Sequence, residues 1–264
     1  MNSLIARIKK LYKLLPPLFS RDMKERYAGS SLGVVWTILN PVLIILLYWM
    51  VFSSFLNIKI PADRYEVPFF IYLLTGILPW FMFQDGALRG ATSIIDKGHI
   101  IKKVFFPPEL FPLSVVLVSF ISYVPGVILI VIGVGVWKGI VFSHLVLFIF
   151  MLFLHLIFTV GVALLLSSIT VYVRDIVHIL SFVFQILFYT TTVLYPLALV
   201  PEKYRDFLLL NPITGFIESY HDLILFSKMP SSFSLLYPAV SSVVFFVVGV
   251  KAFRKLKTGF VDVL

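Results

Sequence analysis

The charged and polar side chains of this 264-residue sequence gather in short connections between long apolar runs. Basic residues and a tyrosine follow two prolines near the N-terminus: Arg21, Lys24, Arg26 and Tyr27. A larger group stands between the second and third apolar runs: Ser93, Asp96, Lys97, His99, Lys102 and Lys103. Arg174 and Asp175 stand between the fourth and fifth runs. A net charge of +9 on so apolar a chain indicates contact with anionic headgroups or a partner protein rather than nucleic acid.

Signatures of catalysis are missing. The sequence has no Gly-x-x-x-x-Gly-Lys-Ser/Thr loop to cradle nucleotide phosphates and no His-Glu-x-x-His zinc motif. Cysteine is absent, which excludes disulfides and thiolate metal sites. His155 and His178 fall within apolar runs or at their ends, where a hydrogen bond to a neighbouring helix is a simpler role than ligation. We therefore predict no catalytic residue, cofactor or metal site.

Aromatic side chains form two stripes within the apolar runs. The stripes are Tyr48, Phe52 and Phe55 in the first run and Phe184, Phe188 and Tyr195 in the fifth. Aromatic faces with polar tips suit a sliding, polyhydroxylated substrate. Charged residues, which mark ion and proton pathways, are almost absent from the run centres. The ordinary alternative is that tyrosines anchor at the interfaces and phenylalanines face lipid, so both roles stay open for each aromatic.

Membrane helices are the elements that must carry these residues. The sequence is 60% hydrophobic and 13% charged, with a mean hydropathy of +1.02, whereas soluble domains are about one-quarter charged. A bilayer core needs about 20 apolar residues of helix. Six runs qualify: 34–57, 67–84, 110–137, 144–169, 176–195 and 233–253. The runs are continuous rather than alternating, so we predict an all-α membrane protein with six transmembrane helices.

Lysine and arginine set the orientation, because cytoplasmic loops retain positive charge. They crowd residues 1–30, 86–108 and 251–257. The opposite connections hold only Lys59, Arg64, Lys138, Lys203, Arg205 and Lys228. Six crossings return the chain to its starting face. We therefore predict a multi-pass protein of the cytoplasmic (inner) membrane with both termini in the cytoplasm.

The prediction divides one domain, residues 1–264, into three parts. Residues 1–30 combine an apolar stripe with basic side chains, which is typical of interfacial helices in the headgroup plane, and Pro16 and Pro17 should end the first of them. The six-helix membrane domain covers 31–257. Residues 258–264 form a cytoplasmic tail.

Two further segments do not fit simple spans. In the cytoplasmic connection, Ser93 and Asp96 have the spacing of a capping box and Gly98 can close a short helix. On the outer side, Asn211 and Pro212 have the types expected at the N-cap and first position of an apolar helix. That outer helix is predicted to be either re-entrant or flat on the membrane surface.

Four stretches carry a resemblance to a known family. They read RDMKERYAGSSLGVVW at 21–36, GILPW at 76–80, IKKVFFPPE at 101–109 and NP at 211–212. This ordered set closely resembles the type-2 ABC exporter permeases that move bacterial cell-surface polysaccharides such as O-antigen, teichoic acid and capsule. The resemblance covers essentially the whole chain. Pro108 departs from the pattern, which often has arginine there.

The resemblance implies a homodimer of permeases with two separate ABC ATPase subunits and, as cargo, a lipid-linked O-antigen or a related glycan. By position, 91–103 resembles the main ATPase-coupling segment of the family, and 21–27 and 174–175 are further candidates. The charged groups named first thus become ATPase-coupling candidates. Aromatic stripes of the first and fifth runs become translocation-path candidates.

Other functions remain in competition. A type-2 ABC exporter for a lipid or drug would share most of these features. A membrane-embedded glycosyltransferase or acyltransferase would need carboxylates or histidines converging near one interface, and the sequence offers no convincing set. A structural scaffold would neither bind nor stimulate an ATPase.

Overall fold

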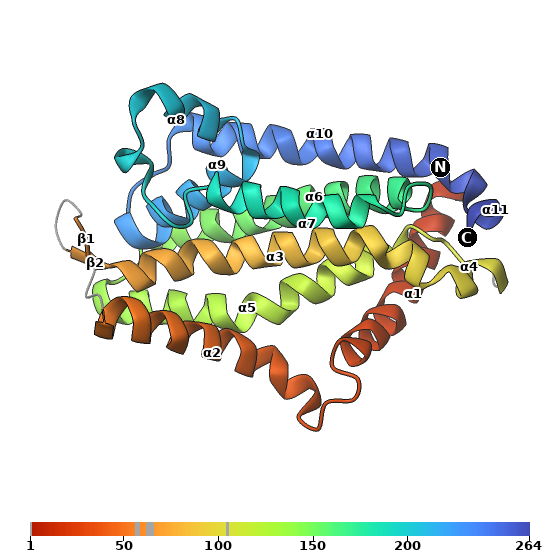
Figure 1. Ribbon diagram of the computed structural model, residues 1–264, viewed down its shortest axis with the longest axis horizontal. Coiled ribbons are helices and arrows are strands. Elements are labelled where there is room, and N and C mark those ends of the chain that lie inside the picture. The colour runs from red at the N-terminus through yellow and green to blue at the C-terminus, as the bar shows by residue number, and fades with distance from the viewer. Residues whose placement is uncertain (1, 56–58, 62–65, 104–105) are drawn as a thin grey trace.

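Long helices running along a common axis make up the protein (Figure 1). The computed structural model describes residues 2–55, 59–61, 66–103 and 106–264. Side chains are described from residue 13 onward, apart from those of 34, 52, 53, 59–61, 66 and 103. Two short strands, β1 (Lys59–Pro61) and β2 (Glu66–Pro68), pair antiparallel with Ile60 opposite Val67. The all-α class is confirmed.

Each predicted apolar run contains a helix. These are α2 (Trp36–Trp49) with the π-helix η2 (Met50–Phe55), α3 (Phe69–Asp96), α5 (Leu110–Lys138), α6 (Phe142–Thr170), α7 (Ile176–Tyr189) and α10 (Ser232–Leu256). Within the described part of the chain, three helices are long and apolar enough to cross a membrane: α5, α6 and the one that extends from α10 to Val263. The α2 and α7 helices are apolar but shorter.

The remaining helical elements lie outside the helices of the predicted runs. They are α1 (Asn2–Arg26), η1 (Gly33–Val35), α4 (Gly98–Lys103), η3 (Leu197–Leu199), α8 (Glu202–Leu209), α9 (Pro212–Tyr220), the π-helix η4 (His221–Phe226), η5 (Lys257–Gly259) and α11 (Phe260–Val263). In Figure 1 both termini lie at one end with α4 and α11, and the strand pair and α8 lie at the other.

Close helix crossings hold the centre together. A Cβ atom added at Gly161 of α6 would lie 2.5 Å from the backbone of Phe245 on α10, and one at Gly90 of α3 would lie 2.6 Å from Ala163 on α6. Only a residue without a side chain allows backbones to approach this closely. The core around these crossings contains Trp80, the largest of the fully buried side chains described.

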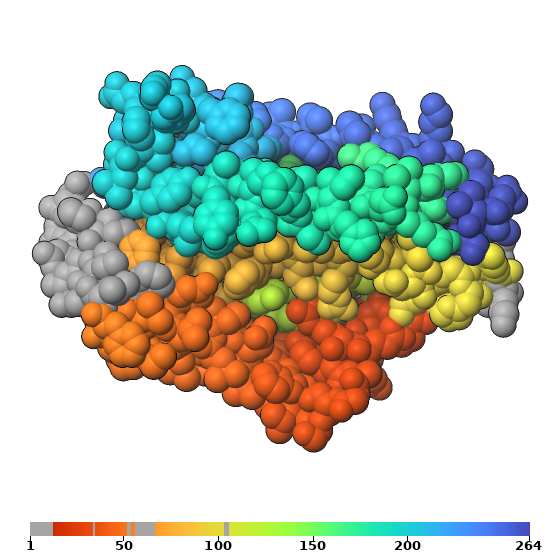
Figure 2. Space-filling model, viewed as in Figure 1, coloured from red at the N-terminus to blue at the C-terminus, as the bar shows by residue number. Residues whose placement is uncertain are grey.

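In contrast, α2 and α7 lie at the edge of the bundle. Their outward faces expose large apolar side chains such as Leu46 and Leu47 on α2 and Ile179 and Phe182 on α7. Figure 2 shows α7 (teal) on the front face, with α3 (gold) between it and α2 (orange). Large apolar side chains are also exposed on α5, α6 and α10, so the two edge helices are two of several with apolar surface for lipid or another chain.

The two N-terminal prolines do not end the first helix, contrary to the prediction. The α1 helix continues through Pro16 and Pro17 to Arg26. Each proline removes one helical hydrogen-bond donor, but both are exposed, so water or headgroups can reach the carbonyls that lose a partner. Leu18 and Asp22 are buried on a face that packs against α5. That contact maintains the helix beyond the prolines.

The capping-box prediction is also wrong. Ser93 lies inside α3, and its hydroxyl donates to the carbonyl of Gly90 at 2.7 Å instead of capping a new helix. An N-cap needs a non-helical backbone, which a residue in the middle of a helix does not have. The α3 helix runs unbroken to Asp96, and α4 starts at Gly98. The last turns of α3 therefore replace the predicted separate helix.

The outer helix begins as predicted. The side chain of Asn211 accepts a hydrogen bond of 3.0 Å from the amide of Ile213, and Pro212 takes the first helical position. Most side chains of α9 and η4 are buried, including Phe216 and Tyr220. These elements pack against α3, α6 and α10. The segment is therefore enclosed by the bundle rather than lying on its surface.

Candidate functional site

Two of the three groups of charged coupling candidates, those of α3 with α4 and of the turn between α6 and α7, lie at the end of the bundle that holds both termini (Figure 1). One group ends α1, the second lies on the last turns of α3 and on α4, and the third lies in the turn between α6 and α7. Tyr172 in that turn donates from its hydroxyl to the carbonyl of Leu256, at the end of α10, at 2.7 Å. The turn between α6 and α7 is thus tied to the end of α10.

An ion pair links the end of α1 to the middle of α3. Arg26 Nη1 lies 2.6 Å from Asp85 Oδ2, and both side chains are largely buried. Arg89, one turn further along α3, lies 3.9 Å from the same carboxylate oxygen. Two guanidinium groups therefore share one carboxylate. The sequence analysis gave neither Asp85 nor Arg89 a role in coupling.

A second polar contact lies one turn earlier on α1. Asp22 is only 3% exposed, and its Oδ2 accepts a hydrogen bond of 2.6 Å from Ser114 Oγ on α5. Lys97 Nζ lies 3.7 Å from the other carboxylate oxygen. A buried carboxylate is stable only when it is hydrogen-bonded or paired. Asp22 was missed, although its position one helical turn after Leu18 places it on the inward face.

Lys97 also contacts Glu25, so one lysine bridges two acidic residues of α1. Burial opposes ionisation of Glu25, but the hydrogen bond and charge of Lys97, together with the charge of Arg21, outweigh it and lower the pKa of this carboxyl. Arg21 lies 3.3 Å from Glu25 along the same helix. Lys97 directly follows α3, so these contacts tie the first helix to the predicted coupling segment.

A polar cavity of about 220 Å³ lies beside these contacts. Its lining comes from α1, α3 with the residue after it, and α5: Asp22, Glu25, Arg89, Thr92, Ser93, Asp96, Lys97 and Val115. Thr92 donates to the Asp96 carboxylate at 2.8 Å. The cavity has room for water between charges that already have partners.

The remaining coupling candidates are exposed. They are Lys24, His99, Lys102, Arg174 and Asp175, and the side chain of Lys103 lies outside the described residues. Tyr27 is partly buried, with the Arg26 guanidinium 5.9 Å from its ring centre. Gly98, at the start of α4, contacts Leu264. The exposed charges are therefore free to reach a partner, whereas the buried ones hold α1 and α3 together.

The aromatic path candidates fall into three environments. Phe55 is 70% exposed. Tyr48 and Phe188 are partly buried against the core, and the Tyr195 hydroxyl donates to the carbonyl of Tyr189 at 2.7 Å. Phe184 is only 2% exposed.

Buried Phe184 lies between α7 and α3. Its ring centre is 5.3 Å from that of Phe83 and 6.4 Å from that of Trp80. Phe184 therefore fixes α7 on α3 and offers no ring surface of its own. The side chain of Phe52 lies outside the described residues, so two of the six candidates cannot be counted among the surface aromatics.

Buried polar contacts anchor α9 and η4 to the rest of the bundle. His155 Nδ1 lies 3.1 Å from the Tyr220 hydroxyl, which confirms the prediction of a hydrogen bond to a neighbouring helix. His221 Nε2 lies 3.0 Å from the carbonyl of Tyr72, whose hydroxyl donates to the carbonyl of Thr192 at 2.9 Å. Within the described residues, no group of three or more acidic or histidine side chains is placed to hold a metal ion.

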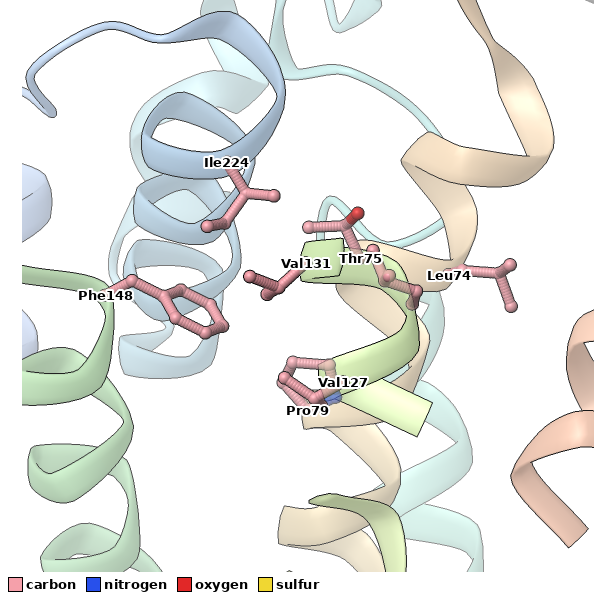
Figure 3. Close-up of a pocket in the computed structure, with 8 residues that line it drawn as sticks. Leu74, Thr75, Pro79, Val127, Val131, Phe148 and Ile224 are labelled. Atoms are coloured by element: carbon pink, nitrogen blue, oxygen red, sulfur yellow. The ribbon is translucent and has the colours of Figure 1, made fainter. Parts of the chain in front are cut away.

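An apolar gap lies where α3, α5, α6 and η4 meet (Figure 3). It has space of only about 10 Å³ for a water-sized sphere and is lined by Leu74, Thr75, Pro79, Val127, Ile130, Val131, Phe148 and Ile224. Such a small apolar gap holds at most one water molecule. It is a packing defect, not a site for a substrate.

Comparison with known proteins gives the family. Residues 16–225 match the ABC-2 type transporter family. This range begins in α1 and ends in η4, so it contains five of the six helices in the predicted runs and both coupling contacts of α1. The chain belongs to the ABC-2 type transporter family.

Individual ABC-2 relatives match nearly the full chain. An "O-antigen export system permease protein RfbA" of Myxococcus xanthus is 34% identical over 249 residues, covering 91% of this chain and 92% of the relative. A protein of the same name from Klebsiella pneumoniae is 30% identical, covering 96% of each chain. A "Polysialic acid transport protein KpsM" of Escherichia coli is 22% identical, covering 90% of this chain and 91% of the relative. The family resemblance inferred from the motifs is confirmed.

The departure at Pro108 has a local explanation in this ABC-2 chain. The carbonyls of Pro107 and Pro108 accept hydrogen bonds from the amides of Leu110 and Phe111 at 3.2 and 3.1 Å. These bonds form the turn that starts α5. Any residue could supply these carbonyls, and proline is tolerated at position 108 because it precedes α5 and has no helical N–H to lose.

Proposed function

We propose that this chain is the membrane-spanning subunit of an ATP-driven exporter that moves a polysaccharide across the cytoplasmic membrane. The observation that carries the proposal is its similarity, over 91–96% of its length, to proteins named as permeases of O-antigen export. The weaker similarity to a polysialic acid transport protein supports the same class of cargo. A lipid-linked O-antigen or a related glycan is the cargo we favour.

The proposed topology has six spans with both termini in the cytoplasm. The spans are α2 with η2, α3, α5, α6, α7 and α10. The stretch 36–55 gives about 30 Å of helix, which matches the hydrocarbon thickness of a bilayer. Both termini lie at one end (Figure 1), which agrees with an even number of crossings. The excess of lysine and arginine at that end supports its placement in the cytoplasm.

In this topology residues 1–264 form one permease domain. Residues 1–30 are interfacial, 31–257 form the six-helix membrane part and 258–264 form a cytoplasmic tail. The α9 and η4 helices enter the membrane from the outer face and return to it. Their burial among α3, α6 and α10 supports this re-entrant path.

Energy comes from a separate ABC ATPase. The 264 residues contain no loop that could cradle nucleotide phosphates. The exposed charges of α4 and of the turn between α6 and α7 offer it a docking surface. The proposed assembly contains two permease copies and two ATPase copies, and the broad apolar faces of α2 and α7 are the surfaces on which the two permeases would meet.

Force would reach the path through α1. A partner that shifts the end of α3 also shifts Lys97, which holds Asp22 and Glu25 of α1. Arg26 and Asp85 form a second link between the same helices. Only the elbow of residues 27–35 separates α1 from α2, so a shift of α1 would also displace the start of α2. The glycan would pass beside α2 and α7, over Tyr48, Phe55, Phe188 and Tyr195.

The experiment is deletion of the gene from a glycan-displaying host, followed by complementation. The account expects loss of surface glycan, accumulation of glycan in the cytoplasm and capture of an ABC ATPase with the tagged chain. Normal surface glycan after deletion would refute the proposal. If the deletion strain keeps its surface glycan but no longer exports a lipid or drug, the result would instead favour a type-2 ABC exporter for that compound.

A further inference from the structure

The elbow between α1 and α2 contains a shallow cleft that lies outside the proposed path and shares Arg26 with the contact to Asp85. Two glycines with left-handed backbone, Gly29 at φ 81° and Gly33 at φ 51°, turn the chain at the lowest point of Figure 1. The cleft has a volume of about 280 Å³. Six residues line it: Arg26, Tyr27, Ala28, Ser30, Trp36 and Asn40.

Hydrogen bonds hold this lining in place. The amides of Ser30 and Gly33 donate to the carbonyls of Tyr27 and Ser30 at 3.1 and 3.2 Å. Trp36 Nε1 donates to Ser30 Oγ at 2.8 Å, which ties the indole ring to the turn. Asn40 follows Trp36 by one helical turn, so the two side chains share one face of α2.

The charged side chain of the cleft already has an ion-pair partner. Arg26 is the one cation among the six lining residues, and Asp85 of α3 lies 2.6 Å from its Nη1. A phosphate group binds best to guanidinium donors that are not already paired with a carboxylate. The paired guanidinium therefore favours a neutral ligand over an anionic headgroup.

The chemistry of the lining suits a sugar. A pyranose ring presents apolar C–H faces, which pack on aromatic rings, and hydroxyls that both donate and accept hydrogen bonds. Tyr27 and Trp36 supply the rings. Asn40 supplies an amide that donates and accepts, and Ser30 supplies a hydroxyl.

Tyrosine and tryptophan also gather at membrane interfaces without binding a ligand. The elbow differs from such a belt in two respects. Its rings line a concave surface together with an amide, and the indole N–H is bonded within the protein instead of being left for headgroups.

We propose that this cleft binds one neutral sugar residue of the transported glycan at the cytoplasmic surface, before the glycan enters the path beside α2. The inference rests on the proposed function. The cleft is slightly smaller than the roughly 300–1,000 Å³ of pockets that hold drug-sized ligands, which suits a single ring rather than a chain. Both α1 and α2 contribute to it, so a bound sugar contacts α1 and the start of α2, which a shift of α1 is proposed to displace.

Photo-crosslinking in the assembled exporter tests this site. The permease carries p-benzoylphenylalanine at Asn40, at Tyr48 on the proposed path, or at lipid-facing Val244 as a control, in membranes that synthesise radiolabelled glycan. Without ATP, the glycan crosslinks at position 40 with a yield several-fold above that at position 244. Separately, Asn40→Ala raises the glycan concentration for half-maximal ATPase stimulation about fivefold, the effect of one lost hydrogen bond.

The outcomes separate the inference from the function on which it rests. Glycan crosslinked at position 48 but not at 40 overturns the cleft and leaves the exporter intact. Phospholipid in place of glycan at position 40 also overturns it. Glycan at neither position overturns both. ATP hydrolysis by the exporter assembled with each variant serves as the folding control for that variant.

Discussion

Arg26 at the end of α1 and Asp85 in α3 are joined by a 2.6 Å ion pair in which both side chains are largely buried. Fifty-nine residues separate them in the sequence. The pair therefore fixes the position of the first helix relative to the helix that leads into the proposed coupling segment, and it allows a force on one to reach the other.

Removing the carboxylate from this pair should uncouple glycan export from ATP hydrolysis. Asp85→Asn leaves two guanidinium groups without their shared anion, and the cost of breaking a partly buried pair is about 1–3 kcal/mol. We expect a lower unfolding midpoint in detergent and less glycan export per ATP hydrolysed. Glu202→Gln at the outer end is the matched control, because the Glu202 side chain is 91% exposed and its pair with Arg205 spans 3.9 Å.

Equal export per ATP in the Asp85→Asn and Glu202→Gln variants would show that the pair transmits no force. The exchange variant, with Arg26→Asp and Asp85→Arg together, should recover part of the lost stability because it restores opposite charges across the same helices.

The contact of Glu25 with Lys97 should depend on pH in one direction. The pKa of Glu25 is lowered in the folded protein from its ordinary 4.5. The contribution of this contact to folding stability is therefore complete above pH 4.5, and it is lost as the pH falls through the lower pKa of the folded state. At pH 7 Glu25→Gln should cost about 0.5 kcal/mol, a small effect because Glu25 is half exposed.

Unfolding midpoints of the wild type and of Glu25→Gln, measured from pH 7 to pH 3, check this prediction. The difference between them should shrink below about pH 4.5. A difference that grows as the pH falls would contradict the assigned contact. The Glu202→Gln difference should stay near zero throughout.

The crossing of α6 and α10 should tolerate no side chain. A Cβ at Gly161 would lie 2.5 Å from the backbone of Phe245, so Gly161→Val forces the helices apart. We expect a loss of more than about 2 kcal/mol in unfolding free energy, or failure to accumulate in the membrane. Gly133→Ala in α5 is the control, because no atom lies within 4 Å of its added Cβ. Similar behaviour of the two variants would contradict the described crossing.

The aromatic track is tested by removing three rings together. The triple variant Tyr48→Ala, Phe52→Ala and Tyr195→Ala should reduce export while ATP hydrolysis continues, because the proposed ATPase-docking surface lies at the other end of the spans. Phe233→Ala with Phe246→Ala, both exposed on α10, is the control. Unchanged export in the triple variant would remove the aromatic track from the account.

Sequence patterns predicted the helices well where neighbouring residues alone determine the structure. Apolar length located each long helix, and the Asn211 and Pro212 pair located the start of α9, because capping depends on neighbouring residues only. The same reasoning failed at Pro16 and Pro17. Packing of α1 on α5 keeps that helix continuous, and such a contact is invisible to a local pattern.

The candidate coupling site could be predicted only in part, because some of its residues depend on contacts between helices. Exposed charges such as Lys102 and Arg174 stand out by type and position. Asp22, Asp85 and Ser114 gain their roles only from partners on other helices, which spacing along the chain does not reveal. Phe184 shows the reverse case, because this member of the predicted stripe faces α3 rather than an open surface.

The most direct test of the central claim is transport by purified components. Permease and ABC ATPase are reconstituted in vesicles with radiolabelled lipid-linked glycan, and movement of glycan to the far leaflet is measured with and without ATP. The account predicts ATP-dependent movement only when both proteins are present, and no ATP hydrolysis by the permease alone. Hydrolysis or glycan movement driven by the isolated permease would contradict it.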